Sequence, residues 1–368
     1  MASLCLHYFS SALYRSYSFK TAIQVNLLTP KTSLSKMASS EYSFTTGTRR
    51  PECRIHTHAH SFTSDHRPNP IDPNQIAHEF RFFRVYKDGR IEKFRSTEKI
   101  PPSDDPITGV RIKDVEISSQ PAVSARIFLP KIHDSTRKLP ILYHVHGGGF
   151  CFQSAFSPLH SKYLTLLTAE ANVITVSVEY GLFPDRPIPA CYEDSWAGLQ
   201  WLAGHVHGNG PEPWINDHAD FRRVFIGGES AGGNISHNLA VRIGSLGLPG
   251  VNLAGMVLVH PYFGGTDDDK MWFYMCPSNG GLQDPRLKPS AGDLARLGSK
   301  RVLMFVAEKD HLNVVGRNYY KELKESGWEG SVEIIENEGE DHCFHMENSS
   351  NEKAVALIQR FVSFMKEE

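Results

Sequence analysis

Short hydrophobic runs recur along most of the chain, and amphipathic stretches separate them. The runs that are almost continuously apolar and rich in Val, Ile and Leu cover residues 140–145, 173–178, 223–226, 253–259 and 301–306. Unbroken apolar runs of this length are typical of strands that are buried on both faces of a parallel sheet. A shorter run at 332–335 alternates apolar and polar residues and predicts one more strand.

In two segments that precede these runs, apolar and polar residues alternate. They are residues 110–119 and 123–130. A period of two predicts strands with one buried and one exposed face, and the short connection predicts a hairpin at a sheet edge. We therefore expect a mostly parallel sheet that is mixed only at its N-terminal edge.

Helical periodicity appears in the longer stretches between the predicted strands. Apolar residues recur at spacings of three and four within residues 192–206, 231–243, 315–326 and 351–366. This spacing places the apolar side chains on one face of a helix. Strands that alternate with helices predict an α/β fold, doubly wound, with helices on both faces of the sheet.

Two aromatic-rich segments do not fit this alternation. Residues 74–94 contain EFRFFRVYKDGRIEKF, and residues 263–281 contain MWFYMCP. Open α/β sheets bind ligands at the carboxyl ends of their strands. We expect the two segments to form a lid over those ends, and the alternative is that they pack against the rim of the sheet.

The predicted strand at 223–226 leads directly into a G-x-S-x-G pattern from Gly228 to Gly232. A serine between a strand end and a helix start lies on a sharp turn that exposes its hydroxyl above the sheet, and the flanking glycines let that turn close. The helix N-terminus behind it favours negative charge. We interpret Ser230 as a nucleophile, and the alternative is a helix N-cap.

A serine hydroxyl needs a base that removes its proton before it can attack. In this fold class the acid and the base follow the serine along the chain, at the ends of later strands. Asp310 comes just after a predicted strand, and the loop before the last helix holds His342 and His345. Either histidine can be the base on this reasoning. Two neighbours of Asp310 compete with these assignments, namely Glu308 and His311.

The first core strand ends in His146-Gly147-Gly148-Gly149. Ordering consecutive glycines costs much conformational entropy, so we expect their lack of side chains to serve a function in this loop. We expect the N–H groups of Gly148 and Gly149, together with that of Ala231, to stabilise an oxyanion. His146 and Gly147 would support the loop, and the alternative is a flexible hinge.

The composition narrows the classes of partner. Hydrophobic residues make up 40% and charged residues 22% of the 368 residues, and the formal charge is −2. This balance argues against nucleic acid and anionic membranes as partners, and no apolar run is long enough to span a bilayer. The 6 cysteines are scattered without metal or disulfide spacing. We predict a small-molecule ester as substrate, free thiols, no cofactor and no metal.

The N-terminal part of the chain differs from the rest. Residues 1–40 are rich in Ser, carry a few Lys and Arg, and contain no acidic residue. This bias predicts a transit peptide for a chloroplast or another plastid; the alternative is a working start at Met37 and a cytoplasmic protein. Residues 41–70 are a polar linker, and their HTHAH is more typical of a solvated tail than of a metal site. We therefore expect a leader and linker at 1–70 and one folded α/β domain at 71–368, for which the resemblance below implies an α/β-hydrolase.

The motifs HGGGF, GESAGGN, AEKD and EGEDHCFH together resemble those of plant carboxylesterases of the hormone-sensitive-lipase branch of α/β-hydrolases. The likeness extends from about residue 75 to the C-terminus. It implies an α/β-hydrolase fold and places the nucleophile, acid and base on Ser230, Asp310 and His342. The oxyanion donors fall on the second and third glycines of HGGG, and His345 becomes a packing residue.

The activity that this resemblance implies is a cofactor-free serine carboxylesterase for short-acyl esters of plant metabolites. The family also includes gibberellin receptors and 2-hydroxyisoflavanone dehydratases, so a dehydratase or lyase and a non-catalytic hormone receptor are alternatives. Receptors of this family resemble esterases that have lost the base histidine, and the presence of His342 argues against that alternative. The sequence departs from the family pattern at Glu229, where Asp is more common, at Gly181, an arginine position, and in a shorter segment at 263–281.

Overall fold

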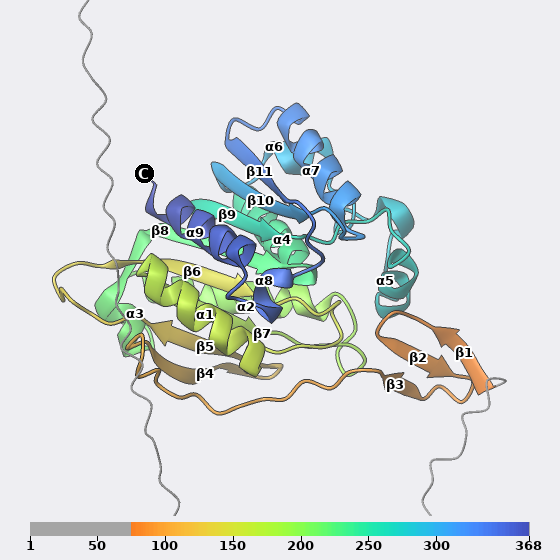
Figure 1. The fold of residues 1–368 in the computed structure, drawn as a ribbon, viewed down its shortest axis with the longest axis horizontal. Helices are drawn as coiled ribbons and strands as arrows, with labels where there is room; N and C mark the ends of the chain where they lie inside the picture. The colour runs from red at the N-terminus through yellow and green to blue at the C-terminus, as the bar shows by residue number, and fades with distance from the viewer. Residues whose placement is uncertain (1–74, 368) are drawn as a thin grey trace, which may run out of the picture. The chain divides into compact units, whose positions relative to one another are not determined.

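A computed structural model describes residues 75–367, and its centre is an eight-stranded sheet (Figure 1). The strands lie in the order β11-β10-β9-β8-β6-β7-β5-β4. Their bounds are β4 (Arg111–Ser119), β5 (Ala122–Leu129), β6 (Leu139–Val145), β7 (Ile174–Glu179), β8 (Ala219–Glu229), β9 (Leu253–Val259), β10 (Arg301–Ala307) and β11 (Ser331–Asn337). Every apolar or alternating run from residue 110 onward coincides with one of these strands.

The direction of the strands agrees with the hydrophobic pattern. Strands β6 to β11 pair in parallel, whereas β4 pairs with β5, and β5 with β7, in antiparallel fashion. Strand β4 is the edge strand and is only partly buried. The prediction of a parallel sheet that is mixed at its N-terminal edge is therefore confirmed.

The strand order reverses at β6. The chain passes from β6 to β7 on one side and then returns to place β8 on the other side of β6. In an open α/β sheet, such a switch point opens a crevice between the loops that follow the two strands. Here those loops are the glycine loop after β6 and the serine turn after β8.

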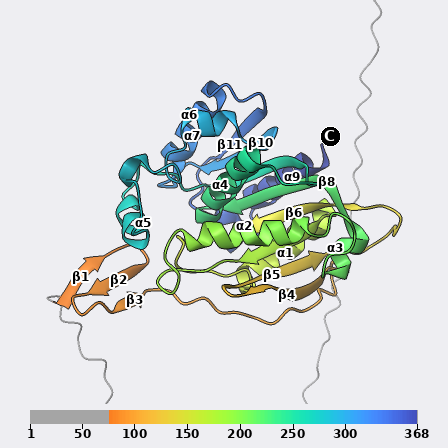
Figure 2. The ribbon, with the colours of Figure 1, turned by 180° about the vertical axis from the view of Figure 1, so that it is seen from behind.

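Helices cover both faces of the sheet. The longer ones are α1 (Pro158–Ala171), α2 (Ala190–Ala203), α4 (Ala231–Leu246), α7 (Asn313–Glu325) and α9 (Glu352–Lys366), and the shorter ones are α3 (Pro213–His218), α6 (Ala291–Ala295) and α8 (Phe344–Glu347). One apolar cluster contains Leu142 with side chains of α1 and α9, and the other contains Ile141 and Tyr143 with side chains of α2, α4 and α7. Alternate residues of β6 thus reach opposite layers. Figures 1 and 2 show the two helix layers from opposite sides.

One long helix was not predicted. Helix α1 buries polar side chains, including His160 and Thr168, among its apolar ones. Its apolar periodicity is weak for that reason, and helical spacing did not reveal it. The four helices that the spacing did predict are present with ends that differ by a few residues.

The two aromatic segments pack against each other. The first forms a small three-stranded antiparallel sheet, β1 (Ile76–Glu79), β2 (Phe83–Tyr86) and β3 (Ile91–Lys93), which the sequence did not predict. The second contains α5 (Asp269–Met275) and the 3-10 turn η2 (Gly281–Gln283). The ring of Tyr274 lies 5.2 Å from that of Phe80, measured between centroids. The two segments are thus in contact through these aromatic rings.

Three further observations concern membrane spans, cysteines and the N-terminal segment. Between residues 75 and 367, no helix is both long and apolar enough to cross a bilayer. The cysteines of this region are free thiols, namely Cys151, Cys191, Cys276 and Cys343. The predicted leader and linker, with Met37 and HTHAH, lie outside the described residues.

Candidate active site

Ser230 is the single residue between the end of β8 and the start of α4. Its backbone has φ 57° and ψ −119°, a conformation that costs an L-residue about 1–3 kcal/mol and persists only where neighbours enforce it. The Ser230 N–H donates to the Val259 carbonyl at 2.9 Å, and the Ser230 carbonyl accepts from the Tyr262 N–H at 3.0 Å. The Ser230 side chain makes no capping hydrogen bond. The hydroxyl therefore does not serve as a helix N-cap.

The glycines of the serine turn pack directly against the end of β6. A Cβ atom on Gly228 would lie 2.4 Å from the Val145 carbonyl oxygen, and one on Gly232 would lie 2.0 Å from it. Any larger residue would push the turn away from β6. The two glycines therefore hold the serine turn beside the loop that follows β6.

Asp310 and His342 come together from the ends of two neighbouring strands. Asp310 follows β10, His342 follows β11, and His342 Nδ1 lies 2.7 Å from Asp310 Oδ2. Burial by itself raises the pKa of Asp310, but contacts with the rings of His311 and His342 hold that pKa well below its usual value. An ionised Asp310 keeps the proton on Nδ1 and leaves Nε2 of His342 as the acceptor.

Ser230 and His342 face the same small cavity, of about 40 Å³. Its wall is completed by Arg81, Phe82, Gly149, Phe150, Ala231, Tyr262, Asp268, Met271, Trp272, His311 and Leu312. Within residues 75–367 the Ser230 hydroxyl makes no hydrogen bond to the His342 ring. Such bonds are often long without substrate and shorten when substrate binds.

Two of the competing residues, His345 and Glu308, lie elsewhere, whereas His311 lines the cavity and contacts Asp310. The His345 ring is buried against Tyr163, with 5.2 Å between centroids, and burial lowers its pKa to about 4. The carboxylate of Glu308 accepts a hydrogen bond from the Gly339 N–H at 2.6 Å. His342 and Asp310 are thus the pair at the cavity, and His345 is a neutral packing residue.

The glycine loop brings bare backbone to the cavity. Gly149 and Ala231 line it beside Ser230, whereas Gly148 is not part of its wall. Gly148 has φ 106°, and a Cβ there would lie 2.1 Å from the Phe152 carbonyl oxygen, so only glycine fits. The N–H groups of Gly148 and Gly149 donate to no acceptor among the described residues. Ala231 opens α4, where an N–H has no partner within the helix.

Glu229 connects the glycine loop to the serine turn. Its carboxylate accepts hydrogen bonds from His144 Nε2 at 2.9 Å, His160 Nε2 at 2.6 Å and the Gly147 N–H at 3.0 Å. Burial raises the pKa of Glu229, but the two rings hold it well below its ordinary value, so the carboxylate is ionised. From the sequence, Glu229 was identified only as a departure from the family pattern, and this role was missed. An acidic residue beside the nucleophile with a histidine inside a core strand was the available signal.

His146 supports the loop from inside the protein. Its ring stacks on Tyr180 with centroids 4.2 Å apart, and its Nδ1 lies 2.8 Å from the Gly147 carbonyl oxygen. Burial lowers the pKa of His146 to about 4, so the ring is neutral near pH 7.

Gly181, the second departure from the family pattern, lies outside the cavity. A Cβ at this position would be 2.5 Å from Cδ of Arg186, and the Gly181 N–H donates to Asp194 at 2.8 Å. Arg186 also pairs with Asp194, at 2.9 Å. The arginine side chain of position 186 therefore fills the space beside Gly181 and supports the fold.

Both aromatic segments contribute to the cavity wall. Arg81 and Phe82 come from the turn between β1 and β2, and Asp268, Met271 and Trp272 come from α5 and its start. A Cβ on Gly149 would lie 2.5 Å from the Phe82 ring, so this ring sits directly over the glycine loop. A cavity of about 40 Å³ is close to the volume of one water molecule. The side chains of both segments thus limit the space directly above Ser230.

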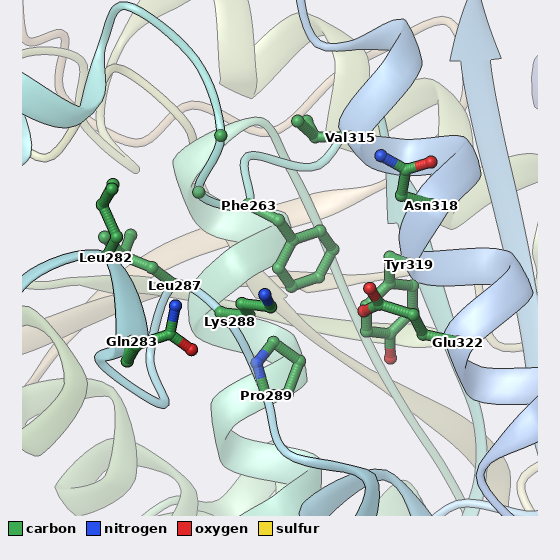
Figure 3. Close-up of a pocket in the computed structure, with 12 residues that line it drawn as sticks. Phe263, Leu282, Gln283, Leu287, Lys288, Pro289, Val315, Asn318, Tyr319 and Glu322 are labelled. Atoms are coloured by element: carbon green, nitrogen blue, oxygen red, sulfur yellow. The ribbon is translucent and has the colours of Figure 1, made fainter.

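A larger cavity, of about 290 Å³, lies between α7 and residues 282–289 (Figure 3). Phe263 and Tyr319 stack at its base with ring centroids 4.3 Å apart. None of the predicted site residues lines this cavity. The cavity lined by Ser230 and His342 is the smaller one.

A group of metal-ligating side chains also borders the site. The donor atoms of His260, His342 and Cys343 lie within 4.8 Å of one another. His260 Nδ1 accepts a hydrogen bond from the Cys343 N–H at 2.9 Å, and His342 Nδ1 contacts Asp310. With Nδ1 as the acceptor, Nε2 of a neutral His260 carries the proton and offers no lone pair. Packing around the Asp310–His342 pair accounts for this group.

Several plant proteins resemble this chain over most of their length. A "2-hydroxyisoflavanone dehydratase" of Glycyrrhiza echinata is 44% identical over 77% of this chain and 93% of the relative. "Probable carboxylesterase 5" of Arabidopsis thaliana is 42% identical over 79% of this chain and 99% of the relative. "Tuliposide A-converting enzyme 1, chloroplastic" of Tulipa gesneriana is 39% identical over 82% of this chain and 80% of the relative.

Solved structures and a family match agree with the observed fold. An esterase of Pyrobaculum calidifontis superimposes with a TM-score of 0.58 at 22% identity, over 70% of this chain and 84% of the esterase. At this identity the likeness concerns the fold. Residues 142–346 match the family described by the alpha/beta hydrolase fold. The chain therefore belongs to the α/β-hydrolase-fold family.

Proposed function

We propose that the protein is a serine carboxylesterase that hydrolyses short-acyl esters of small plant metabolites. Ser230 Oγ attacks the ester carbonyl while His342 Nε2 takes its proton, and Asp310 stabilises the imidazolium that forms. The oxyanion accepts hydrogen bonds from the N–H groups of Gly148, Gly149 and Ala231. His342 then protonates the leaving alcohol, and water hydrolyses the acyl-enzyme by the same route in reverse.

One observation carries this proposal. A serine in a strained turn and a histidine paired with a buried carboxylate at 2.7 Å line one cavity, beside backbone N–H groups that have no acceptor among the described residues. Acyl transfer needs these three elements together. The relatives named carboxylesterase support the same activity.

The proposal is tested with p-nitrophenyl esters of increasing acyl length. We expect the wild-type protein to prefer short acyl chains and Ser230→Ala to lose several orders of magnitude in turnover. Ser363→Ala is the matched control, because Ser363 is exposed on α9. An unchanged rate in Ser230→Ala would reject the assignment.

A dehydratase acting on a specialised metabolite is the second candidate, because a relative of 44% identity carries the name 2-hydroxyisoflavanone dehydratase. Loss of water from a small phenolic scaffold, without turnover of any ester in the panel, would favour it. A non-catalytic hormone receptor is the third candidate. Covalent labelling of Ser230 by a fluorophosphonate would argue against the receptor but not against the dehydratase.

We further propose delivery to a plastid, directed by residues 1–40. The acid-free, Ser-rich composition of that segment supports it, as does the word chloroplastic in the name of the Tulipa gesneriana relative. Mass spectrometry of the mature N-terminus tests it. Removal of an N-terminal segment from the protein in isolated plastids would support delivery to a plastid. A mature protein that starts at Met37 in the cytosol would contradict it.

A further inference from the structure

His311 joins the predicted catalytic carboxylate to the lid segments. Its Nδ1 lies 3.1 Å from Asp310 Oδ1, and its Nε2 lies 2.9 Å from Asp268 Oδ2. Asp268 in turn pairs with Arg81 Nε at 3.1 Å. Asp310 follows β10, whereas Asp268 precedes α5 and Arg81 belongs to the β1–β2 turn. This chain of contacts thus runs from the sheet to both aromatic segments.

The two carboxylates require a charged ring. A neutral imidazole has one N–H and one lone pair, so a neutral His311 would point its lone pair at a carboxylate oxygen. The protonated ring offers an N–H to each carboxylate. Burial opposes this charge, but Asp268 and Asp310 raise the pKa of His311 to about 9 against the opposing effect of Arg81, whose Nη1 lies 3.4 Å from His311 Nδ1.

We propose that His311 is a positioning residue: a cationic link that holds Asp310 in register with His342 while it holds the lid segments closed over Ser230. One ring nitrogen of His311 contacts Asp310 on the side of the sheet, and the other contacts Asp268 on the side of the lid. The orientation of Asp310 and the closure of the lid therefore both depend on protonation of the His311 ring. The Leu312 N–H, 2.9 Å from Asp310 Oδ1, is the remaining donor to that oxygen. The kinetic part of this inference rests on the proposed function.

The charged groups around His311 set the direction of each variant. Asp310 and Asp268 face its two nitrogens, Arg81 lies beside the ring, and the His342 ring is 5.6 Å away between centroids. Removing the charge of Asp268 should lower the pKa of His311 by about one unit or more, the usual effect of losing an opposite charge at this distance. Replacing Arg81 by Gln should raise it.

The first test needs no turnover. Proton NMR of the full chain follows the histidine ring signals from pH 6 to 10, and the signal absent from His311→Asn identifies His311. We expect a titration midpoint near pH 9 in the wild-type protein, a lower midpoint in Asp268→Asn and a higher one in Arg81→Gln. A wild-type midpoint at or below pH 7, or identical midpoints in all three proteins, would overturn the proposal.

The second test measures kcat/KM for p-nitrophenyl acetate over the same pH range. We expect an alkaline decline near pH 9 in the wild-type protein, a decline at lower pH in Asp268→Asn, and no such decline in His311→Asn. Asp217→Asn and His133→Asn are controls, because both residues are exposed and lie outside the cavity wall. An alkaline decline that remains near pH 9 in His311→Asn would overturn the proposal.

The two tests separate the inference from the proposed function. Ester turnover that persists in Ser230→Ala, together with the expected NMR midpoints, would reject the esterase proposal and retain the link. Turnover that depends on Ser230, together with an ordinary midpoint for His311, would retain the esterase and reject the link.

Discussion

Three donors converge on the carboxylate of Asp310. His342 contacts one oxygen at 2.7 Å, and the Leu312 N–H and the His311 ring contact the other at 2.9 and 3.1 Å. A buried carboxylate without such partners would take up a proton. The ionised state of Asp310, on which the orientation of His342 depends, is therefore a property of these contacts and not of the residue alone.

Asp310→Asn tests this dependence. The amide cannot hold the proton on Nδ1 of His342 as a carboxylate does, so we expect kcat to fall by roughly 10³–10⁴-fold with little change in KM. Glu308→Gln is the matched control, because Glu308 lies two positions away and contacts Gly339. Equal losses in the two variants would contradict the assignment of Asp310, rather than Glu308, as the partner of His342.

Glu229→Gln tests the connection between the serine turn and the glycine loop. The Glu229 carboxylate accepts three hydrogen bonds in the protein interior, and an amide would turn its NH₂ group toward one of those donors. We expect a loss of about 1–3 kcal/mol in the free energy of unfolding, measured with urea. Glu329→Gln, at an exposed position, should leave the urea midpoint unchanged. A stable Glu229→Gln with full activity would show that the connection is dispensable.

At the scale of elements, the hydrophobic pattern determined how much could be predicted. Unbroken and alternating runs located β4 to β11, because burial on one or two faces leaves a direct record in the sequence. Helix α1 left none, since His160 and Thr168 interrupt its apolar face. Strands β1 to β3 were missed because they bury only a few side chains and pack on α5 rather than on the main sheet.

The candidate site was predictable where a residue type implies chemistry. The order of residue types along the chain indicated Ser230, Asp310 and either His342 or His345, and the family resemblance selected His342. The fold then places Ser230, Asp310 and His342 after β8, β10 and β11. Contacts between distant segments left no such trace. The bonds of Glu229 to His144 and His160, and of His311 to Asp268, depend on side-chain geometry that spacing does not encode.

Phe82→Ala tests whether the first aromatic segment, residues 74–94, acts as a lid. The Phe82 ring covers Gly149 and reduces the cavity to about 40 Å³. Removing the ring enlarges the space above the glycine loop, so we expect kcat/KM for longer acyl chains to rise relative to that for acetate. Phe94→Ala, which removes a ring that is 42% exposed, is the control. An unchanged chain-length profile in Phe82→Ala would mean that the acyl group binds elsewhere.

Across the whole molecule, the parallel sheet brings distant residues together. The switch point at β6 sets the glycine loop beside the serine turn, and the loops after the outer strands β10 and β11 bring Asp310 and His342 to the same edge. The polar interior that this arrangement requires includes neutral histidines at three positions. These are His146, His237 and His345, whose pKa values burial lowers to about 4, 3 and 4.

These histidines predict how stability depends on pH. These rings take up protons near pH 6.5 in the unfolded chain but only near pH 4 and below in the folded protein. Their contribution to the free energy of unfolding is therefore fully present above pH 6.5 and is lost as the pH falls. We expect a loss on the order of 2 kcal/mol per ring between pH 7 and pH 5, measured by urea unfolding. The fall should be smaller in His345→Phe. Equal stability of the wild-type protein at pH 7 and pH 5 would contradict the neutral, buried state of these rings.

The proposed function requires that the serine at the end of β8 is activated. The most direct test is covalent labelling by a fluorophosphonate. Peptide mass spectrometry locates the labelled residue in the wild-type protein, Ser230→Ala and His342→Ala. We predict that wild-type protein is labelled at Ser230 alone, that Ser230→Ala takes up no label, and that His342→Ala reacts far more slowly. Labelling at another residue, or equally fast labelling of Ser230 without His342, would contradict the activation of Ser230 by His342.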